Sequence, residues 1–478
     1  MKNNDSLLSN VSWKFAERIT AQIVSTIVSI IIARVLDPEH YGIIAIVNIF
    51  ITLANVFVSD GFGSALIQKK DADKIDFSSV LYFNISFSIV LYIVLFIIAP
   101  FVSAFYGEGY EILTPVLRVL SIRIILSSIN SIQHAYVAKK MMFEKFFWAT
   151  LIGTIISAVV GIWLAYSGFG VWALVAQYLT NTTIDTVALI VLIRKKPLFV
   201  FSWKRVKGLV NFGSKVLATN LLIVGYTELR ALVIGKMYSS EDLAYFDKGK
   251  QFPSLIINNV NTSLSAVLFP KMASEQDDID KIKQITKTSI RISSFVFCPM
   301  MLGLLAVAPT FVYAVLTEKW MPCVPYIQLL AINYMFYPIH SANMSAIKAT
   351  GHSKTLLLME IIKKSIELIV FLCVLWYGVD AIVWGMISCS TVFVLFNAWP
   401  NRKNINYSIS EQIKDIFPSL FMSIVMAVSV YFMNYIPFNK WIVLLLQIVA
   451  GVLIYFSLAI ITKNTELTRI LKIIKKNK

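Results

Sequence analysis

The sequence predicts an all-α integral membrane protein with about fourteen transmembrane helices. Of its 478 residues, 57% are hydrophobic and only 15% are charged, and the mean hydropathy is +0.72. An average soluble protein is about 25% charged. Apolar runs long enough to cross a bilayer core of ~30 Å recur along the whole chain, and they are far longer than the strands of a membrane β-barrel. These observations leave no room for a separate soluble domain.

The predicted spans follow one another with short connections. Glu17 and Arg18 interrupt the first run and no small-residue cleavage site follows it, so we expect a helix there rather than a cleaved signal. The apolar periodicity predicts spans at about 12–35, 42–67, 78–101, 114–137, 147–166, 171–193, 211–235, 243–269, 288–316, 325–347, 355–377, 381–400, 413–434 and 441–462.

The positive charge of the chain indicates how the spans are oriented in the membrane and does not indicate a nucleic-acid partner. The formal net charge is +16, and the cations lie mainly in alternate loops, as the positive-inside rule predicts. The loops between them contain mainly carboxylates, such as Asp37, Glu39, Glu108 and Glu111. We therefore expect an even number of spans with both termini in the cytoplasm. The basic tail at 463–478 is expected to lie on the anionic inner leaflet.

The first six spans repeat in the next six, shifted by about 202 to 210 residues. The run IIARVLDPEHYG (31–42) matches VIGKMYSSEDLA (233–244), and PVLRVLSI (115–122) matches PYIQLLAI (325–332). Six spans return the chain to its starting side, so the halves are parallel repeats with cargo expected at their interface. We expect an N-terminal six-helix bundle at 1–203, a C-terminal bundle at 204–405, two peripheral helices at 406–462 and a basic tail at 463–478.

Several predicted spans carry a polar stripe that lipid would not tolerate. In the span at 243–269, polar residues recur at helical spacing on one face: Asp247, Lys250, Ser254, Asn258, Asn261 and Ser265. Other stripes lie on the fourth span (Arg123, Ser127, Asn130 and His134) and the sixth (Gln177, Asn181 and Asp185). Such faces must contact other helices or line a water-filled cavity, and helix packing is the simpler alternative for the uncharged residues.

Ionisable side chains within the spans are the strongest site candidates, because each costs roughly 2.5–3.5 kcal/mol at the centre of a membrane helix on insertion scales. Candidates for contact with an anionic cargo are the cations Arg18, Arg123, Arg230, Lys248, Lys250, Arg291 and Lys348, with Asn258 and Asn261. Candidates for a coupling cation are Glu17, Asp60 and Glu228. Pairing of these charges with each other is the alternative. His134 is interpreted as a hydrogen-bonded structural histidine in preference to a proton carrier.

Motifs for catalysis, nucleotides or metals are missing from the sequence. It has no Gly-rich loop ending in Gly-Lys-Ser/Thr and no His-Glu-x-x-His. Ser345 and Lys348 match Ser-x-x-Lys without a companion motif. The four cysteines have no metal spacing, and only Cys323 falls in an external loop. We therefore expect neither an enzyme nor a cofactor, and no metal site.

Four long segments resemble the polysaccharide-transporter branch of the MOP superfamily, which includes the Wzx-type flippases. They are DGFGSALIQKKDADKIDFSSVLYFN (60–84), GFGVWALVAQYL (168–179), SSEDLAYFDKGKQFPSLIINNVNTSLSAVLFPKMASEQDD (239–278) and LTEKWMPCVPYIQLLAI (316–332). The resemblance covers the twelve repeated spans, whereas the last two spans match only in hydropathy.

The resemblance implies two six-helix bundles around a central cavity that opens alternately to each side of a bacterial cytoplasmic membrane. It also implies a cargo, an undecaprenyl-diphosphate-linked oligosaccharide repeat unit of the O-antigen, capsule, exopolysaccharide or teichuronic-acid type. Arg230, Lys248 and Lys250 are the cations that the resemblance assigns to this anionic cargo. A polysaccharide polymerase and chain-length proteins are candidate partners.

Three alternatives stay open. A drug or cation antiporter of the MATE type would carry a small cation and should have a mainly acidic and aromatic cavity. A lipid II flippase of the MurJ type would carry a chemically similar lipid and should be essential for growth. A scaffold of a glycan-assembly complex would not explain charges buried in the spans.

Overall fold

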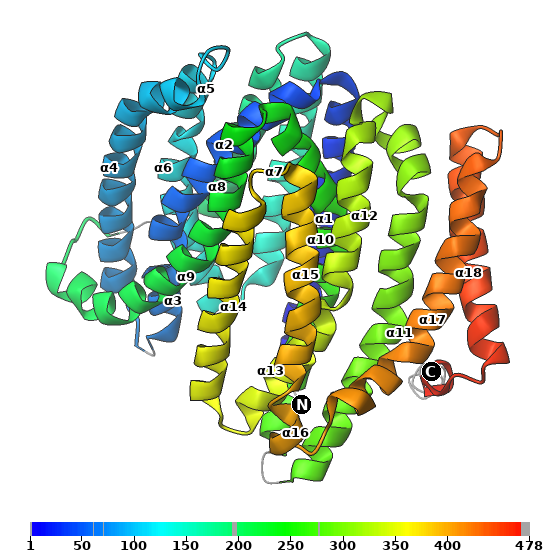
Figure 1. Ribbon diagram of the computed structural model, residues 1–478. Helices are drawn as coiled ribbons and strands as arrows, with labels where there is room; N and C mark the ends of the chain where they lie inside the picture. The colour runs from blue at the N-terminus through cyan, green and yellow to red at the C-terminus, as the bar shows by residue number, and fades with distance from the viewer. Residues whose placement is uncertain (1, 61, 70, 194–197, 276–277, 470–478) are drawn as a thin grey trace. The chain divides into compact units, whose positions relative to one another are not determined.

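The computed structural model describes residues 2–60, 62–69, 71–193, 198–275 and 278–469, and these residues form helices joined by short loops (Figure 1). The side chains of some residues within the helices, among them those of Asp60 and Asn261, lie outside the described part. The chain divides into two compact units, Met1–Ala244 and Tyr245–Lys478.

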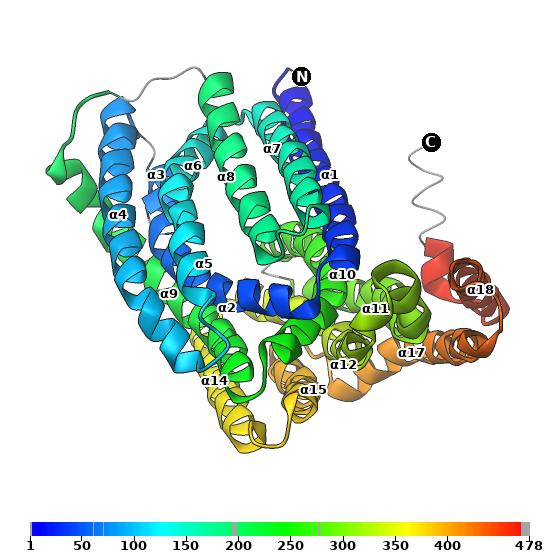
Figure 2. The ribbon, with the colours of Figure 1, turned by 90° about the horizontal axis from the view of Figure 1, so that it is seen from above.

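The first unit consists of nine α-helices and the first turn of a tenth, within its described residues. They are α1 (Lys2–Val35), α2 (Pro38–Asn55), α3 (Phe62–Gln68), α4 (Lys74–Tyr106), α5 (Leu113–Leu120), α6 (Ile122–Lys139), α7 (Phe143–Tyr166), α8 (Val171–Ile193), α9 (Trp203–Met237) and the start of α10 (Ser240–Ala273). A π-helical turn at Val56–Asp60 separates α2 from α3. Helices α1, α7 and α8 pack side by side, and α6 lies against α8 (Figure 2).

The second unit contains the rest of α10 and eight more α-helices within its described residues. They are α11 (Ile279–Phe311), α12 (Val324–Met335), α13 (Tyr337–Ala349), α14 (Ser353–Val374), α15 (Val379–Ala398), α16 (Asn401–Asn404), α17 (Ile409–Phe432) and α18 (Lys440–Ile461). Helix α11 is the centre of the packing, because α12, α13, α17 and α18 all contact it.

Eleven helical segments of the described chain are long and apolar enough to cross a membrane. The chain is therefore an all-helical membrane protein. The other three spans that the sequence predicts, at 243–269, 325–347 and 355–377, are helical as well, in α10, in α12 with α13, and in α14. In α14, four charged residues fall within two turns: Glu360, Lys363, Lys364 and Glu367.

Apolar packing holds α17 and α18 against α11. Phe297 and Met301 of α11, Met426 of α17 and Tyr455 of α18 belong to one buried cluster. The Tyr455 hydroxyl donates a 2.8 Å hydrogen bond to the backbone oxygen of Phe295, which satisfies a polar group that lipid would leave unpaired. The last two predicted spans are thus firmly attached to the second unit.

One glycine permits a close helix contact within the first unit. A Cβ added to Gly42 of α2 would lie 1.9 Å from the backbone oxygen of Ser240, at the first residue of α10. The same end of α10 is held by Tyr110, whose hydroxyl accepts a 3.1 Å hydrogen bond from the backbone nitrogen of Ser240. Any larger residue at position 42 would have to displace backbone, so glycine is required here.

Candidate functional site

A polar cavity of about 500 Å³ lies in the first unit between α6 and α8. It is lined by the predicted stripe of the fourth span, by two residues of the stripe predicted on the sixth span, and by parts of α3 and α7: Ser59, Gly63, Ile67, Arg123, Ser127, Asn130, Ser131, His134, Ala135, Val137, Ala138, Phe143, Phe146, Asn181, Thr182 and Asp185. The prediction that these two stripes are more than lipid-facing surface is confirmed, because both face one cavity.

Asp185 is the polar centre of this cavity, and its side chain is only 14% exposed. Asn130 donates a 2.7 Å hydrogen bond to Oδ2, and the Thr150 hydroxyl lies 3.4 Å from Oδ1. The Nε2 atom of His134 lies 3.6 Å from Oδ2. Asp185 can come this close to α7 because Gly153 faces it, where a Cβ would lie 3.2 Å from the Asp185 backbone nitrogen.

Arg123 lines the same cavity, but unlike Asp185 it has no oppositely charged neighbour among the described ion pairs. Its Nε donates a 3.0 Å hydrogen bond to the Thr182 hydroxyl, and its guanidinium lies 5.4 Å from the ring centre of Tyr178. Among the ion pairs of the described residues, none involves Arg123. A guanidinium held by a hydroxyl and an aromatic ring keeps its charge available for an anion.

The second unit has a cavity of about 440 Å³ between α13, α14 and α15. Lys348, one of the predicted cargo residues, lines it and is exposed. His340 Nδ1 lies 2.7 Å from Asn397 Nδ2 across the helices, and Lys363 donates a 2.5 Å hydrogen bond to Glu360. The charges of α14 have no role in the sequence-based prediction, although their position two turns inside a predicted span was the available signal.

Four predicted residues lie along α9 and α10. Glu228 and Arg230 are half-buried on α9, and the Arg230 guanidinium lies 5.4 Å from the ring centre of Tyr226. On α10, Lys248 is buried, with its Nζ 5.5 Å from the Trp320 ring centre and 3.2 Å from Gln251 Oε1, while Lys250 is half-buried. Lys248 thus contacts Trp320 and Gln251 of its own unit.

Arg291 is placed in an ion-pair network rather than at either cavity. Its Nε lies 3.4 Å from Asp415 Oδ1 on α17 and 3.6 Å from Glu466 Oε1 beyond α18. The Tyr407 hydroxyl donates a 2.7 Å hydrogen bond to the same Asp415. These contacts join α11 to the last two spans. A cargo role for Arg291 stays a prediction without support from its surroundings.

The remaining predicted residues are placed as follows. Glu17 is buried and Arg18 half-buried on α1, and Asn258 is exposed on α10. Asp60 ends the π-helical turn and Asn261 lies in α10, but both side chains are outside the described part. In the part of the chain that the structure describes, no group of His, Cys, Asp or Glu side chains is arranged to hold a metal ion.

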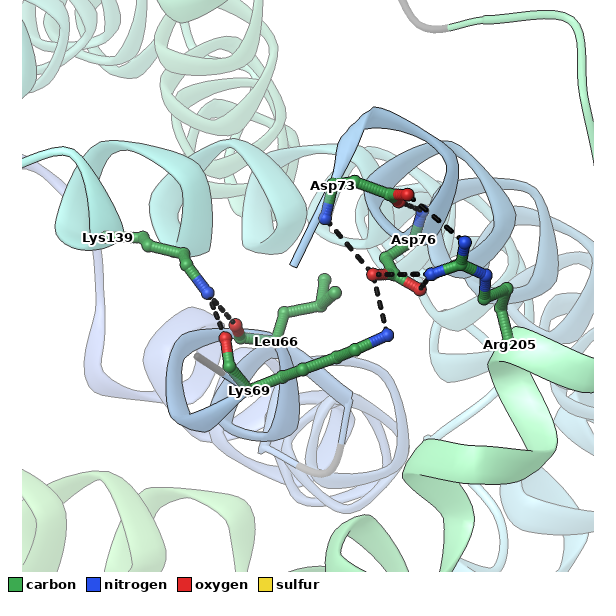
Figure 3. Close-up of polar contacts among 6 residues, drawn as sticks. All are labelled: Leu66, Lys69, Asp73, Asp76, Lys139 and Arg205. Carbon is green, nitrogen blue, oxygen red and sulfur yellow. Dashed lines mark hydrogen bonds and ion pairs between the residues drawn. The ribbon is translucent and has the colours of Figure 1, made fainter. Parts of the chain in front are cut away.

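A second polar cluster joins four helix ends of the first unit (Figure 3). Asp76 in the first turn of α4 is fully buried and accepts a 2.7 Å hydrogen bond from Lys69. Arg205 of α9 lies 3.3 Å from Asp76 and 3.2 Å from Asp73. Lys139, at the end of α6, donates to the backbone oxygens of Leu66 and Lys69. Sequence reasoning had treated these cations as topology signals only.

Comparison with known proteins places this architecture in a family. The profile of the family described as "Polysaccharide biosynthesis protein" matches residues 31–325, more than half of the chain. The chain is 22% identical to the succinoglycan biosynthesis transport protein ExoT of Rhizobium meliloti, over 100% of this chain and 97% of that protein. It is 25% identical to the teichuronic acid biosynthesis protein TuaB of Bacillus subtilis, over 63% of this chain and 62% of that protein.

Solved structures show the same fold at lower identity. The lipid II flippase MurJ in its inward closed conformation superposes with a TM-score of 0.75 at 17% identity, covering 95% of this chain and 99% of that one. An inward-facing multidrug transporter of the MATE family superposes with a TM-score of 0.63 at 15% identity, covering 81% and 96%. The chain is a multi-pass membrane transport protein rather than an enzyme, and it belongs to the family of polysaccharide biosynthesis proteins.

Proposed function

We propose that this chain is a flippase that moves an undecaprenyl-diphosphate-linked oligosaccharide repeat unit from the inner to the outer leaflet of the cytoplasmic membrane by alternating access. The observation that carries the proposal is Arg123, a guanidinium that faces a polar cavity and has no ion pair among the described residues. A diphosphate or an acidic sugar is a fitting partner for it, because guanidinium binds such anions in a bidentate geometry. The lipid tail would stay in the bilayer, which avoids burying it in a polar site.

The other cations of the spans complete the proposed cargo path. In this account Arg230, Lys248 and Lys250 contact the anionic headgroup, Arg18 and Lys348 contribute positive charge, and Asn258 and Asn261 bond sugar hydroxyls. Glu17, Asp60 and Glu228 are proposed to take part in cation coupling. A charged side chain within a span is costly unless it has such a role or a partner.

The proposed architecture has fourteen spans, of which the first twelve are two parallel repeats at 1–203 and 204–405. Backbone geometry supports the repeat. Met141 and Gly351 both have positive φ (54° and 79°) after equivalent helices, and so do Gly168 and Gly378 (81° and 106°). Both pairs are separated by the same distance along the chain. Asn130 and His340 are separated by that distance as well, and each bonds the helix that ends its own repeat.

The proposed orientation puts both termini and the basic tail in the cytoplasm of a bacterial cell. The lysine-rich loops would then face the anionic leaflet, which the positive-inside rule favours. A polysaccharide polymerase and chain-length proteins would receive the cargo on the outer side.

Deletion of the gene in its host tests the function. We expect undecaprenyl-linked repeat units to accumulate and surface polysaccharide to fall, with restoration by the wild-type gene. Two fold relatives supply the competing functions. Unchanged surface glycan with new drug sensitivity would support a MATE-type antiporter, and loss of viability would support a lipid II flippase. Either result would contradict the proposal.

A further inference from the structure

The cavity between α6 and α8 contains a carboxylate and an imidazole that no assigned role uses. Asp185 Oδ2 and His134 Nε2 are 3.6 Å apart, which is longer than a hydrogen bond and within reach of an ion pair. The His134 Nε2 atom is buried and has no hydrogen-bond partner. The ring packs against Phe146 in a T-shaped arrangement, with the ring centres 4.4 Å apart. His134 is therefore held in place with its Nε2 atom open to one partner, Asp185.

We propose that Asp185 and His134 form a proton-binding site of the transport cycle, holding one proton between them while the cavity is closed and exchanging it with water when the cavity is open. This inference rests on the proposed function, because it assumes that the cavity opens and closes during transport. It replaces the structural interpretation of His134 that the sequence favoured.

The charge balance of the pair favours a bound proton. A carboxylate within a membrane needs a neutralising partner, and His134 is the residue within ion-pair distance of Asp185 among the described ion pairs. Imidazole neutralises a carboxylate only when it is protonated. The pair is thus neutral with one proton and negative with none, so closing the cavity over the empty pair is electrostatically unfavourable.

Among the described residues, no other cation lies within ion-pair distance of Asp185. Helix α8 packs against α2, α5, α6 and α7. Helix α7 contributes Thr150 and Gly153 and has no charged residue after Lys145. His40 of α2 lies beside Gly170, and Arg118 of α5 is engaged with Phe96. On α6, Arg123 lines the same cavity as a permanent cation bonded to Thr182 and makes no ion pair with Asp185, so His134 is the partner that can gain and lose a proton.

Proton exchange by this pair gives the return step of the carrier a direction. After releasing its cargo outside, the empty carrier must close over the cavity again, and the closed pair requires its proton. A proton taken up from the outer solution is then released inside. One elementary charge moved inward across about 100 mV biases this step by about fiftyfold.

Infrared spectroscopy of the purified protein tests the site without requiring transport. We expect the difference spectrum between acidic and alkaline protein to contain an imidazole-ring band that reports the proton held by the pair. Asp185→Asn and His134→Gln should each remove the band, because the proposed proton is held by the two side chains together. Asp380→Asn, an exposed carboxylate in the first turn of α15, is the matched control and should leave the band unchanged.

Export assays in the deletion strain complete the test. Asp185→Asn, produced at the wild-type level, should lose the dependence of export on external pH and reduce export by about fiftyfold. A band that survives in Asp185→Asn, or export that follows Na⁺ and ignores pH, would overturn the proton site. If wild-type protein fails to restore export at all, the proposed function fails, while the infrared titration still decides whether the site binds a proton.

Discussion

Arg205 and Asp76 form an ion pair that ties the segment after α8 to the start of α4, with Nη1 and Oδ1 3.3 Å apart (Figure 3). Backbone bonds reinforce the contact, because Leu198 N and Ser202 N donate to the hydroxyls of Ser78 and Ser79. Asp76 also caps α4 together with Asp73, each carboxylate accepting from the backbone of the other residue. The buried Asp76 carboxylate therefore joins the start of α4, the end of the α3 segment at Lys69 and the start of α9.

This network predicts that Asp76→Asn is destabilising. Removing the buried charge takes the shared partner from Lys69 and Arg205, which are partly exposed, and Arg205 keeps Asp73, so the loss should be ~1–3 kcal/mol. We expect a clearly lower melting temperature of the purified protein in detergent. Arg205→Ala should cost less, because Arg205 is half-exposed. Lys204→Ala, exposed one residue earlier, is the control, and an Asp76→Asn protein as stable as that control would contradict the account.

The contact of Gly42 with Ser240 predicts a steric defect. Gly42→Ala places a Cβ 1.9 Å from a backbone oxygen, so α2 or α10 must shift. Overpacking of this kind typically costs ~1–3 kcal/mol. Gly225→Ala in α9 is the matched control, since its Cβ would meet nothing within 4 Å. Thermal unfolding of both variants measures the difference, and equal stability would show that the two helix ends do not meet.

Replacement of the proposed cargo cations should lower export without lowering the amount of protein. Arg123→Ala, Arg230→Ala and Lys250→Ala each remove a cation from a span, and each should lower surface polysaccharide about tenfold or more while the membrane content of the protein stays normal. Lys204→Ala, which removes an exposed cation from the first turn of α9, should export normally. Wild-type export by all three variants would exclude a cationic cargo path.

The buried position of Cys323 predicts that its thiol is not labelled by thiol reagents in the native protein. The sequence placed this residue in an accessible external loop, but the structure buries its side chain completely at the end of a short 3₁₀ helix. Burial raises the pKa of the thiol to about 12. Only the thiolate reacts, so the reactive fraction is negligible at neutral pH and stays small even near pH 9. Labelling should require denaturation, and rapid labelling of the native protein would contradict this burial.

Topology is better tested with cysteines introduced at exposed loop positions. Glu111→Cys should react with an impermeant maleimide in intact cells, whereas Lys140→Cys should react only after lysis, because the two loops lie on opposite sides in the proposed orientation. Both residues are exposed, which makes them a matched pair. The reverse pattern would invert the orientation of the termini.

Periodicity predicted much of the fold and part of the site. The stripes of the fourth and sixth spans identified Arg123, Asn130 and Asp185 as neighbours of a cavity, because helical spacing fixes which residues share a face. The fold class follows from apolar length, which the bilayer imposes on any spanning segment.

Pairing across long sequence distances could not be predicted in the same way. Arg291 was predicted as a cargo residue because the sequence does not show that it pairs with Asp415. Asp415 lies in a span that the repeat does not include. Lys69 and Arg205 looked like topology signals because nothing local reveals that Asp76 will be buried between them. The position of a charged residue is known from the sequence, whereas the residue with which it pairs depends on tertiary packing.

Reconstitution in vesicles measures directly whether the chain moves a lipid-linked glycan between leaflets. Lipid-linked glycan extracted from the deletion strain is placed with purified protein in vesicles, and its leaflet is determined by accessibility to an impermeant sugar-modifying enzyme. The account predicts that wild-type protein exposes the glycan of the inner leaflet to the enzyme and that Arg123→Ala does not. Equal protection of the glycan with wild-type protein and with empty vesicles would contradict it.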